Sequence, residues 1–187
     1  PQGALPEESG SHPAGNRRLT VPGIAGGNAA VELLVFYPAS QSGSNAPLQR
    51  KDAPYPLVVF GHGFSLTTGL YDSLYAHLAG HGFVVAGVAT EEQLLTGNLP
   101  RFSQDFKAAV LGLRAEAGRL GSPLEGAVAG AVKAAAAGHS IAAGAHTIVI
   151  DHDVARLRVV HEQTGGQAVT IVADSDRLER YTAIADV

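Results

Sequence analysis

Three short stretches of the sequence combine residue types that could carry out a nucleophilic reaction. The first is "GHSIA", residues 138–142, in which Ser140 is flanked by small residues. The second is "GHGFS", residues 61–65, and the third is "DSDR", residues 174–177. A serine hydroxyl becomes an effective nucleophile when a base takes its proton, a carboxylate orients that base and backbone N–H groups stabilise the oxyanion that forms. The three stretches offer a hydroxyl, a carboxylate and a glycine-rich turn.

Each of these stretches follows an apolar run that predicts a β-strand. Residues 57–60 precede "GHGFS", residues 132–137 precede "GHSIA" and residues 168–173 precede "DSDR". Residues 57–60, "LVVF", are wholly apolar, as expected of a strand buried on both faces. In open parallel sheets, functional sites form in the loops at the carboxyl ends of the strands. We therefore expect the three stretches to meet at one edge of a sheet.

The alanine-rich run around Ser140 allows a second interpretation. Alanine is the best helix former, so "AVKAAAAGHSIAAGA" has helical propensity. Gly130, Gly138 and Gly144 count against an uninterrupted helix, since glycine costs about 1 kcal/mol relative to alanine inside a helix. From this run alone, Ser140 is either a nucleophile on a sharp strand-to-helix turn or an ordinary helical serine.

The rest of the pattern predicts an α/β fold. Short apolar runs alternate with segments of helical spacing, which is typical of a mostly parallel sheet with helices on both faces. The further expected strands are 31–37, 83–89 and 147–150, and the expected helices are 70–78, 102–120 and 154–164.

The domain organisation predicted is one flexible arm and one domain. Residues 1–17 are rich in Pro, Gly and Ser and show no hydrophobic period, which is typical of a mobile terminus. Residues 18–187 are long enough for a single domain with its own core. A polar arm of this kind often follows a cleaved signal, so we expect a secreted or periplasmic location.

Composition excludes several classes of function. The net charge is −4 without a basic cluster, which argues against nucleic-acid binding. No apolar run reaches the ~18 residues of a membrane span. The chain has no cysteine and no metal-ligand spacing such as HExxH, so we expect no disulfide, no metal and no cofactor. Composition says nothing of the oligomeric state.

Residues 54–91, "PYPLVVFGHGFSLTTGLYDSLYAHLAGHGFVVAGVATE", resemble the front half of an α/β-hydrolase. They are similar to the branch with cutinase-like polyester hydrolases, dienelactone-hydrolase-like esterases and platelet-activating-factor acetylhydrolases. The resemblance covers roughly residues 30–180. It implies an esterase or lipase activity in which a serine hydrolyses a small or polymeric carboxylic ester through an acyl-enzyme, without a cofactor.

The resemblance also implies roles for individual residues. Ser140 lies where the family has its nucleophile elbow, although Ala142 replaces the usual glycine. The N–H groups of Ile141 and Phe64 would form the oxyanion hole. Asp176 would be the catalytic acid. Asp174 and Asp151 are the second and third choices for that acid.

The general base departs from the family pattern. It should be a histidine after the acid, but no histidine follows Asp176 in this sequence. We therefore expect the C-terminal part of the fold that carries this histidine to be missing. His62 is expected to brace the oxyanion loop, and His139 to project away from the attacking oxygen. The alternative function is a non-catalytic or truncated hydrolase-like domain that binds a ligand or partner.

Overall fold

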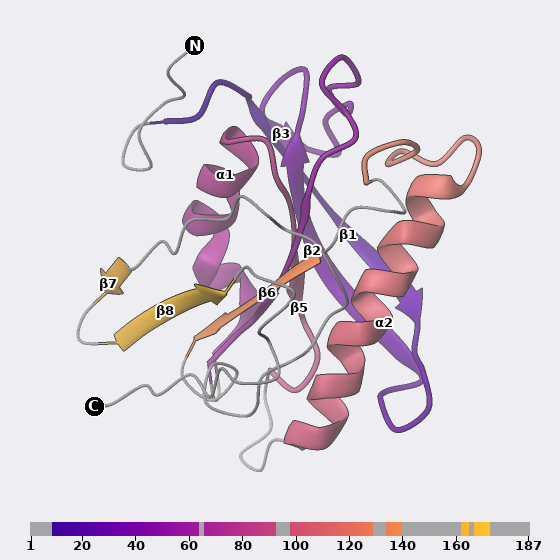
Figure 1. The fold of residues 1–187 in the computed structure, drawn as a ribbon, viewed down its shortest axis with the longest axis vertical. Helices are drawn as coiled ribbons and strands as arrows, with labels where there is room; N and C mark the ends of the chain where they lie inside the picture. Colours follow the sequence, from indigo (N-terminus) through magenta and orange to yellow (C-terminus); the bar gives the residue numbers. More distant parts are fainter. Residues whose placement is uncertain are drawn as a thin grey trace.

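The computed structural model describes residues 9–63, 66–92, 98–128, 134–139, 162–164 and 167–172. These residues form one mixed sheet with a helix packed on each face (Figure 1). The order of the strands across the sheet is β3-β1-β2-β5-β4-β6-β8-β7. The strands are β1 (Ala14–Pro22), β2 (Ala30–Pro38), β3 (Gly43–Ser44), β4 (Leu57–Gly61), β5 (Val84–Val88), β6 (Ala134–His139), β7 (Glu162–Thr164) and β8 (Gln167–Val172). The helices are η1 (Thr68–Tyr71), α1 (Asp72–Gly80) and α2 (Leu99–Gly118).

The centre of the sheet is parallel. Strand β4 lies between β5 and β6 and runs parallel to both. Antiparallel pairs flank this centre, with β2 beside β5 and β8 beside β6. Every residue of β4 is buried, as its unbroken apolar sequence predicts for a strand covered on both faces. The predicted α/β architecture is therefore confirmed.

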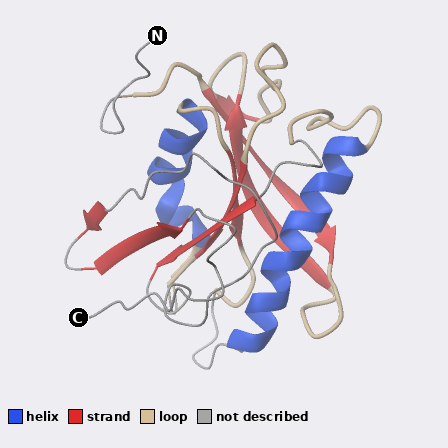
Figure 2. Cartoon of the chain, viewed as in Figure 1, coloured by secondary structure: helices blue, strands red, loops and turns tan. Residues whose placement is uncertain are grey.

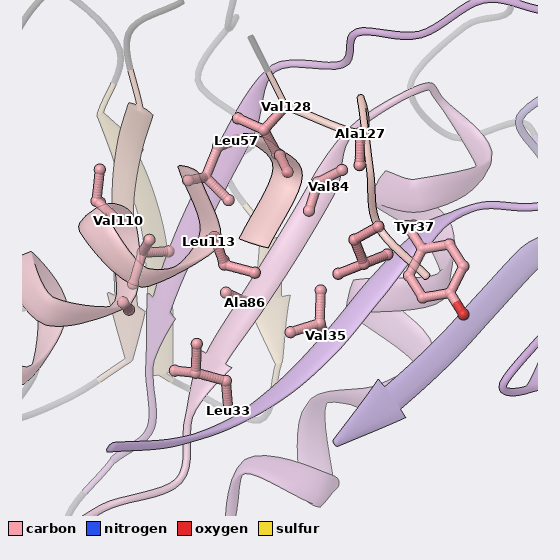
Figure 3. Close-up of a cluster of buried hydrophobic side chains, with 14 of the residues drawn as sticks. Leu33, Val35, Tyr37, Leu57, Val84, Ala86, Val110, Leu113, Ala127 and Val128 are labelled. Carbon is pink, nitrogen blue, oxygen red and sulfur yellow. The ribbon is translucent and has the colours of Figure 1, made fainter. Parts of the chain in front are cut away.

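The two helices α1 and α2 lie on opposite sides of the sheet (Figure 2), and alternate residues of the central strands pack toward one or the other. Val58 and Phe60 pack in the cluster on the side of α1, whereas Leu57 and Val59 pack in the cluster on the side of α2. This alternation follows from the two-residue period of a strand. Figure 3 shows the cluster on the α2 side, where side chains of α2 such as Leu113 meet the sheet.

The amino-terminal part of the chain differs from the prediction. Strand β1 begins at Ala14, which pairs with Pro38 of β2, so residues 14–17 belong to the sheet and not to a flexible arm. Ahead of the strand, the N–H of His12 donates to the carbonyl of Gly80. Residues 14–17, "AGNR", have no hydrophobic alternation, so the sequence did not mark their pairing with β2. Residues 1–8 lie outside the described part of the chain.

The later half of the chain confirms one predicted element and corrects another. Strand β8 matches the predicted strand at 168–173, and it is antiparallel to β6. Residues 162–164, expected at the end of a helix over 154–164, instead form β7 and pair with β8. The remainder of that predicted helix and the predicted strand at 147–150 lie outside the described residues.

The helices predicted in the first 120 residues from their apolar spacing are both present. The helix predicted over 102–120 is α2, and the one predicted over 70–78 is η1 followed by α1. Within the described part of the chain, neither helix is long and apolar enough to cross a membrane.

Candidate active site

Two of the chemically suggestive stretches leave the sheet side by side. Strands β4 and β6 are parallel neighbours, and Gly61 is paired with Gly138. The "GHGFS" stretch therefore starts next to the end of β6, whose last residue, His139, immediately precedes Ser140 in the sequence. This confirms that the carboxyl ends of two predicted strands meet at one edge of the sheet.

The predicted catalytic and oxyanion residues themselves lie outside the described part of the chain. This holds for Ser140 and Ile141, for Phe64, and for Asp176 with its alternatives Asp174 and Asp151. Their roles therefore stay predictions. The structure gives the residues that directly precede two of them, namely Gly63 and His139.

Strand β6 answers part of the question raised by the alanine-rich run. Residues 134–139 form a strand between β4 and β8, so the helical interpretation is wrong for this segment. Most of these residues are buried, and Ala135 and Ala137 pack in the cluster on the α1 side. Burial in the sheet has overridden the intrinsic helical preference of alanine, which is a weak effect by comparison.

Tyr71, at the junction of η1 and α1, connects the ends of β4 and β6. Its hydroxyl oxygen accepts the N–H of Gly63 at 3.1 Å and lies 2.6 Å from Nδ1 of His139. The two rings meet edge to face, with their centroids 5.7 Å apart. In the sequence, Tyr71 falls within the helix predicted over 70–78 and has no motif around it. Helical spacing could not show that its hydroxyl reaches a strand 68 residues later.

The protonation of Tyr71 follows from its surroundings. Burial raises the pKa of the phenol above its usual value, and the N–H of Gly63 opposes this only in part. The hydroxyl therefore keeps its proton at neutral pH. Because its oxygen already accepts from Gly63, that proton is available to a second group.

His62 holds the other backbone group of Gly63. Its Nδ1 lies 2.9 Å from the carbonyl oxygen of Gly63, and its Nε2 lies 2.7 Å from the carbonyl oxygen of Thr90. The ring is buried and packs against Phe102 of α2, with centroids 5.0 Å apart. The expected role of His62 as a brace of this loop is thus seen in its contacts. Both partners are carbonyl oxygens, so a ring nitrogen bonds to either of them as an N–H donor.

A buried carboxylate extends this side of the site. Asp105 of α2 is fully buried, and its oxygens accept the backbone N–H of Asn28 at 2.8 Å, the side-chain amide of Asn28 at 2.6 Å and the hydroxyl of Thr90 at 2.7 Å. Thr90 therefore links His62 to Asp105. Sequence reasoning missed this cluster, because Asp105 sits in the middle of a helix with no motif around it.

The close approach at Gly63 leaves no room for a side chain. A Cβ built there would lie 2.8 Å from Nδ1 of His139 and 2.9 Å from Cδ1 of Leu66. Glycine is required at this position so that the loop can approach the ring of His139. Among the residues that the structure describes, no group of three or more His, Asp or Glu side chains is placed to hold a metal ion.

Known proteins resemble this chain in sequence and in fold. Residues 24–94 match the family model described as "Platelet-activating factor acetylhydrolase, isoform II". A platelet-activating factor acetylhydrolase of Cavia porcellus is 34% identical over 70 residues, which are 37% of this chain and 15% of the relative. A solved structure, "Bacterial Heroin Esterase", aligns with a TM-score of 0.54 and 23% identity over 77% of this chain and 41% of its own.

These comparisons confirm the resemblance read from residues 54–91. The structural match establishes an α/β-hydrolase type of fold, and the family model covers the part of the chain from β2 to β5. The chain spans less than half the length of each of these two relatives.

Proposed function

We propose that this chain is a serine hydrolase of carboxylic esters, with Ser140 as its nucleophile. One observation carries the proposal: Gly61 and Gly138 are paired on parallel neighbouring strands, so the predicted oxyanion loop starts beside a residue that lies two positions before Ser140. The esterase relatives support the type of reaction.

The proposed reaction follows the acyl-enzyme route. The oxygen of Ser140 bonds to the ester carbonyl carbon while a general base takes its proton. The N–H groups of Phe64 and Ile141 stabilise the tetrahedral oxyanion. The bond to the alcohol then breaks, and the alcohol leaves with the proton from the base. Water attacks the acyl-enzyme in the same way and releases the acid.

The remaining groups have supporting roles in this proposal. The resemblance implies a histidine as the base, with Asp176 orienting its ring. Each oxyanion donor is expected to be worth about 10²–10³ in turnover. The substrate class proposed is a short acyl ester such as an acetate, in keeping with the acetylhydrolase relatives.

The test measures hydrolysis of p-nitrophenyl acetate and labelling by a fluorophosphonate probe. Ser140→Ala should lower turnover by a factor on the order of 10⁴ or more and abolish labelling. The matched control is Ser73→Ala, which changes an exposed serine on α1 and should leave both unchanged. A turnover of Ser140→Ala equal to that of the wild-type chain contradicts the proposal. A wild-type chain that neither hydrolyses the ester nor reacts with the probe also contradicts it, and favours a hydrolase-like domain that only binds a ligand.

A further inference from the structure

Tyr71 touches the two backbone segments that lead into the predicted reactive groups. Gly63, whose N–H it accepts, immediately precedes Phe64, the predicted oxyanion donor. His139, whose Nδ1 lies 2.6 Å from its hydroxyl, immediately precedes Ser140, the predicted nucleophile. One phenol therefore connects the segment before the oxyanion donor with the segment before the nucleophile.

We propose that Tyr71 is a positioning residue that fixes the separation between the oxyanion donor and the nucleophile. The inference rests on the proposed function, which supplies those two roles. In this proposal Tyr71 acts through its contacts with Gly63 and His139.

The direction of the hydrogen bonds completes the argument. Tyr71 accepts from Gly63 and, in this proposal, donates its own proton to Nδ1 of His139, which lies 2.6 Å away. A neutral His139 then carries its proton on Nε2. This chain of donors is complete only with a hydroxyl at position 71, because a ring without one can neither accept from Gly63 nor donate to His139.

The ring of Tyr71 and the segment that carries it are held in place by their neighbours. Its ring contacts those of Phe60 and Tyr75, with centroids 4.8 and 6.1 Å away. Thr68, at the start of η1, donates its N–H to the carboxylate of Glu92, and its hydroxyl is 2.8 Å from that of Tyr75. The phenol is therefore a fixed spacer. Fixed spacing matters because a misplacement of about 1 Å can cost about 10²-fold in rate.

The kinetic test is Tyr71→Phe, with Tyr37→Phe as the matched control. The hydroxyl of Tyr37 also accepts one N–H, from Nε of Arg17 at 3.1 Å, and donates to one acceptor, the carbonyl of Ala46 at 2.8 Å. Tyr37 lies on β2, and two strands, β5 and β4, separate β2 from β6. Both variants lose the same kind of hydroxyl, so a purely structural role predicts the same result for both.

We expect Tyr71→Phe to lower kcat about 10- to 100-fold, with KM changed less than about threefold, because misplacement affects the transition state more than substrate binding. Tyr37→Phe should leave kcat unchanged. The two melting temperatures should fall by similar amounts. If Tyr71→Phe keeps the wild-type kcat while Ser140→Ala is inactive, the positioning role is wrong.

A second readout does not depend on activity. Nitrogen-15 NMR of the His139 ring, assigned by its loss in His139→Gln, should show an unprotonated Nδ1 and a protonated Nε2. Tyr71→Phe should shift the Nδ1 resonance, and Tyr37→Phe should not. A protonated Nδ1 would overturn the donation from Tyr71 to His139, and an Nδ1 resonance that ignores Tyr71→Phe would overturn the hydrogen bond and with it the proposal. If the bond is present but no turnover depends on Ser140, the proposed function fails, and the positioning role fails with it.

Discussion

Gly63 is held by two networks that differ in what lies behind them. On the α1 side, Tyr71 accepts its N–H and continues to His139 at the end of β6. On the α2 side, His62 contacts its carbonyl oxygen and continues through Thr90 to the buried carboxylate of Asp105. The first network joins the two segments that precede the predicted reactive groups. The second joins the same loop to the core around α2.

The two networks differ in which peptide of the loop they hold and in which part of the fold they connect it to. A trans peptide is planar, so the direction of the Gly63 carbonyl also sets the direction of the N–H that follows it. The network of His62 therefore acts on the peptide that would carry the oxyanion donor, whereas Tyr71 holds the preceding peptide, between His62 and Gly63, and reaches β6. We expect changes on the α2 side to cost mainly folding free energy, and changes on the α1 side to cost mainly turnover.

The largest effect on stability is expected from Asp105→Ala. The change leaves three donors, two on Asn28 and one on Thr90, without their acceptor. Each unsatisfied buried group costs about 1–3 kcal/mol, so the free energy of unfolding should fall by about 3 kcal/mol or more. Urea unfolding measures this loss, and Asp52→Ala, at an exposed position, is the control.

Asp105→Asn refines this prediction. It keeps the size of the side chain but replaces one acceptor oxygen with an NH₂ group that faces a donor, so its loss should lie between wild type and Asp105→Ala. A loss below about 1 kcal/mol in Asp105→Ala would mean that the α2-side network is not what anchors the loop.

Gly63→Ala should lower both the stability of the fold and the rate of turnover. The new methyl group would meet Nδ1 of His139 at 2.8 Å, where Tyr71 now binds. We expect a stability loss of about 1–3 kcal/mol from overpacking, and a fall in kcat of at least about tenfold because the ring must move. Gly69→Ala is the matched control, since a Cβ there meets nothing within 4 Å. Normal turnover in Gly63→Ala would show that this close approach is not needed for the reaction.

Alkaline pH should produce the smallest effect, and it tests the phenol of Tyr71. Burial raises the pKa of Tyr71 above its usual value of 10.0, so the unfolded chain loses this proton first as the pH rises. The contribution of Tyr71 to stability is then complete below about pH 10 and declines above it.

The measurement is the stability of wild type relative to Tyr71→Phe, by urea unfolding at about pH 8 and about pH 11. The difference should shrink or reverse at the higher pH. Tyr75, whose pKa is also raised by burial, is present in both proteins and cancels. A difference that grows above pH 10 would mean that the Tyr71 phenol ionises more readily in the folded protein than in the unfolded chain.

Local patterns in the sequence were sufficient for the central elements of the fold. The apolar run at 57–60 predicted β4, and the spacing from Phe102 predicted α2. Strand β1 was missed because its polar residues hide a strand that depends on pairing with β2. The run at 134–139 was ambiguous because alanine fits both a helix and a crowded strand, and only its neighbours decide between them.

The candidate site was predictable only where a motif marked it. The "GHGFS" and "GHSIA" stretches indicated the right edge of the sheet, and His62 was expected as a brace. Tyr71 and Asp105 had no such signal, since their partners lie 68 and 77 residues away along the chain. Contacts of this kind arise from the packing of the helices on the sheet and have no local pattern.

The central claim is that Ser140 is the nucleophile, and the most direct measurement is the site of covalent labelling. The folded chain is treated with a fluorophosphonate, digested with trypsin and analysed by mass spectrometry. The peptide between Lys133 and Arg156 contains Ser140 as its one serine. The account predicts a single adduct on Ser140 that is lost when the protein is unfolded before labelling. An adduct on another residue, or no adduct on the folded chain, would contradict it.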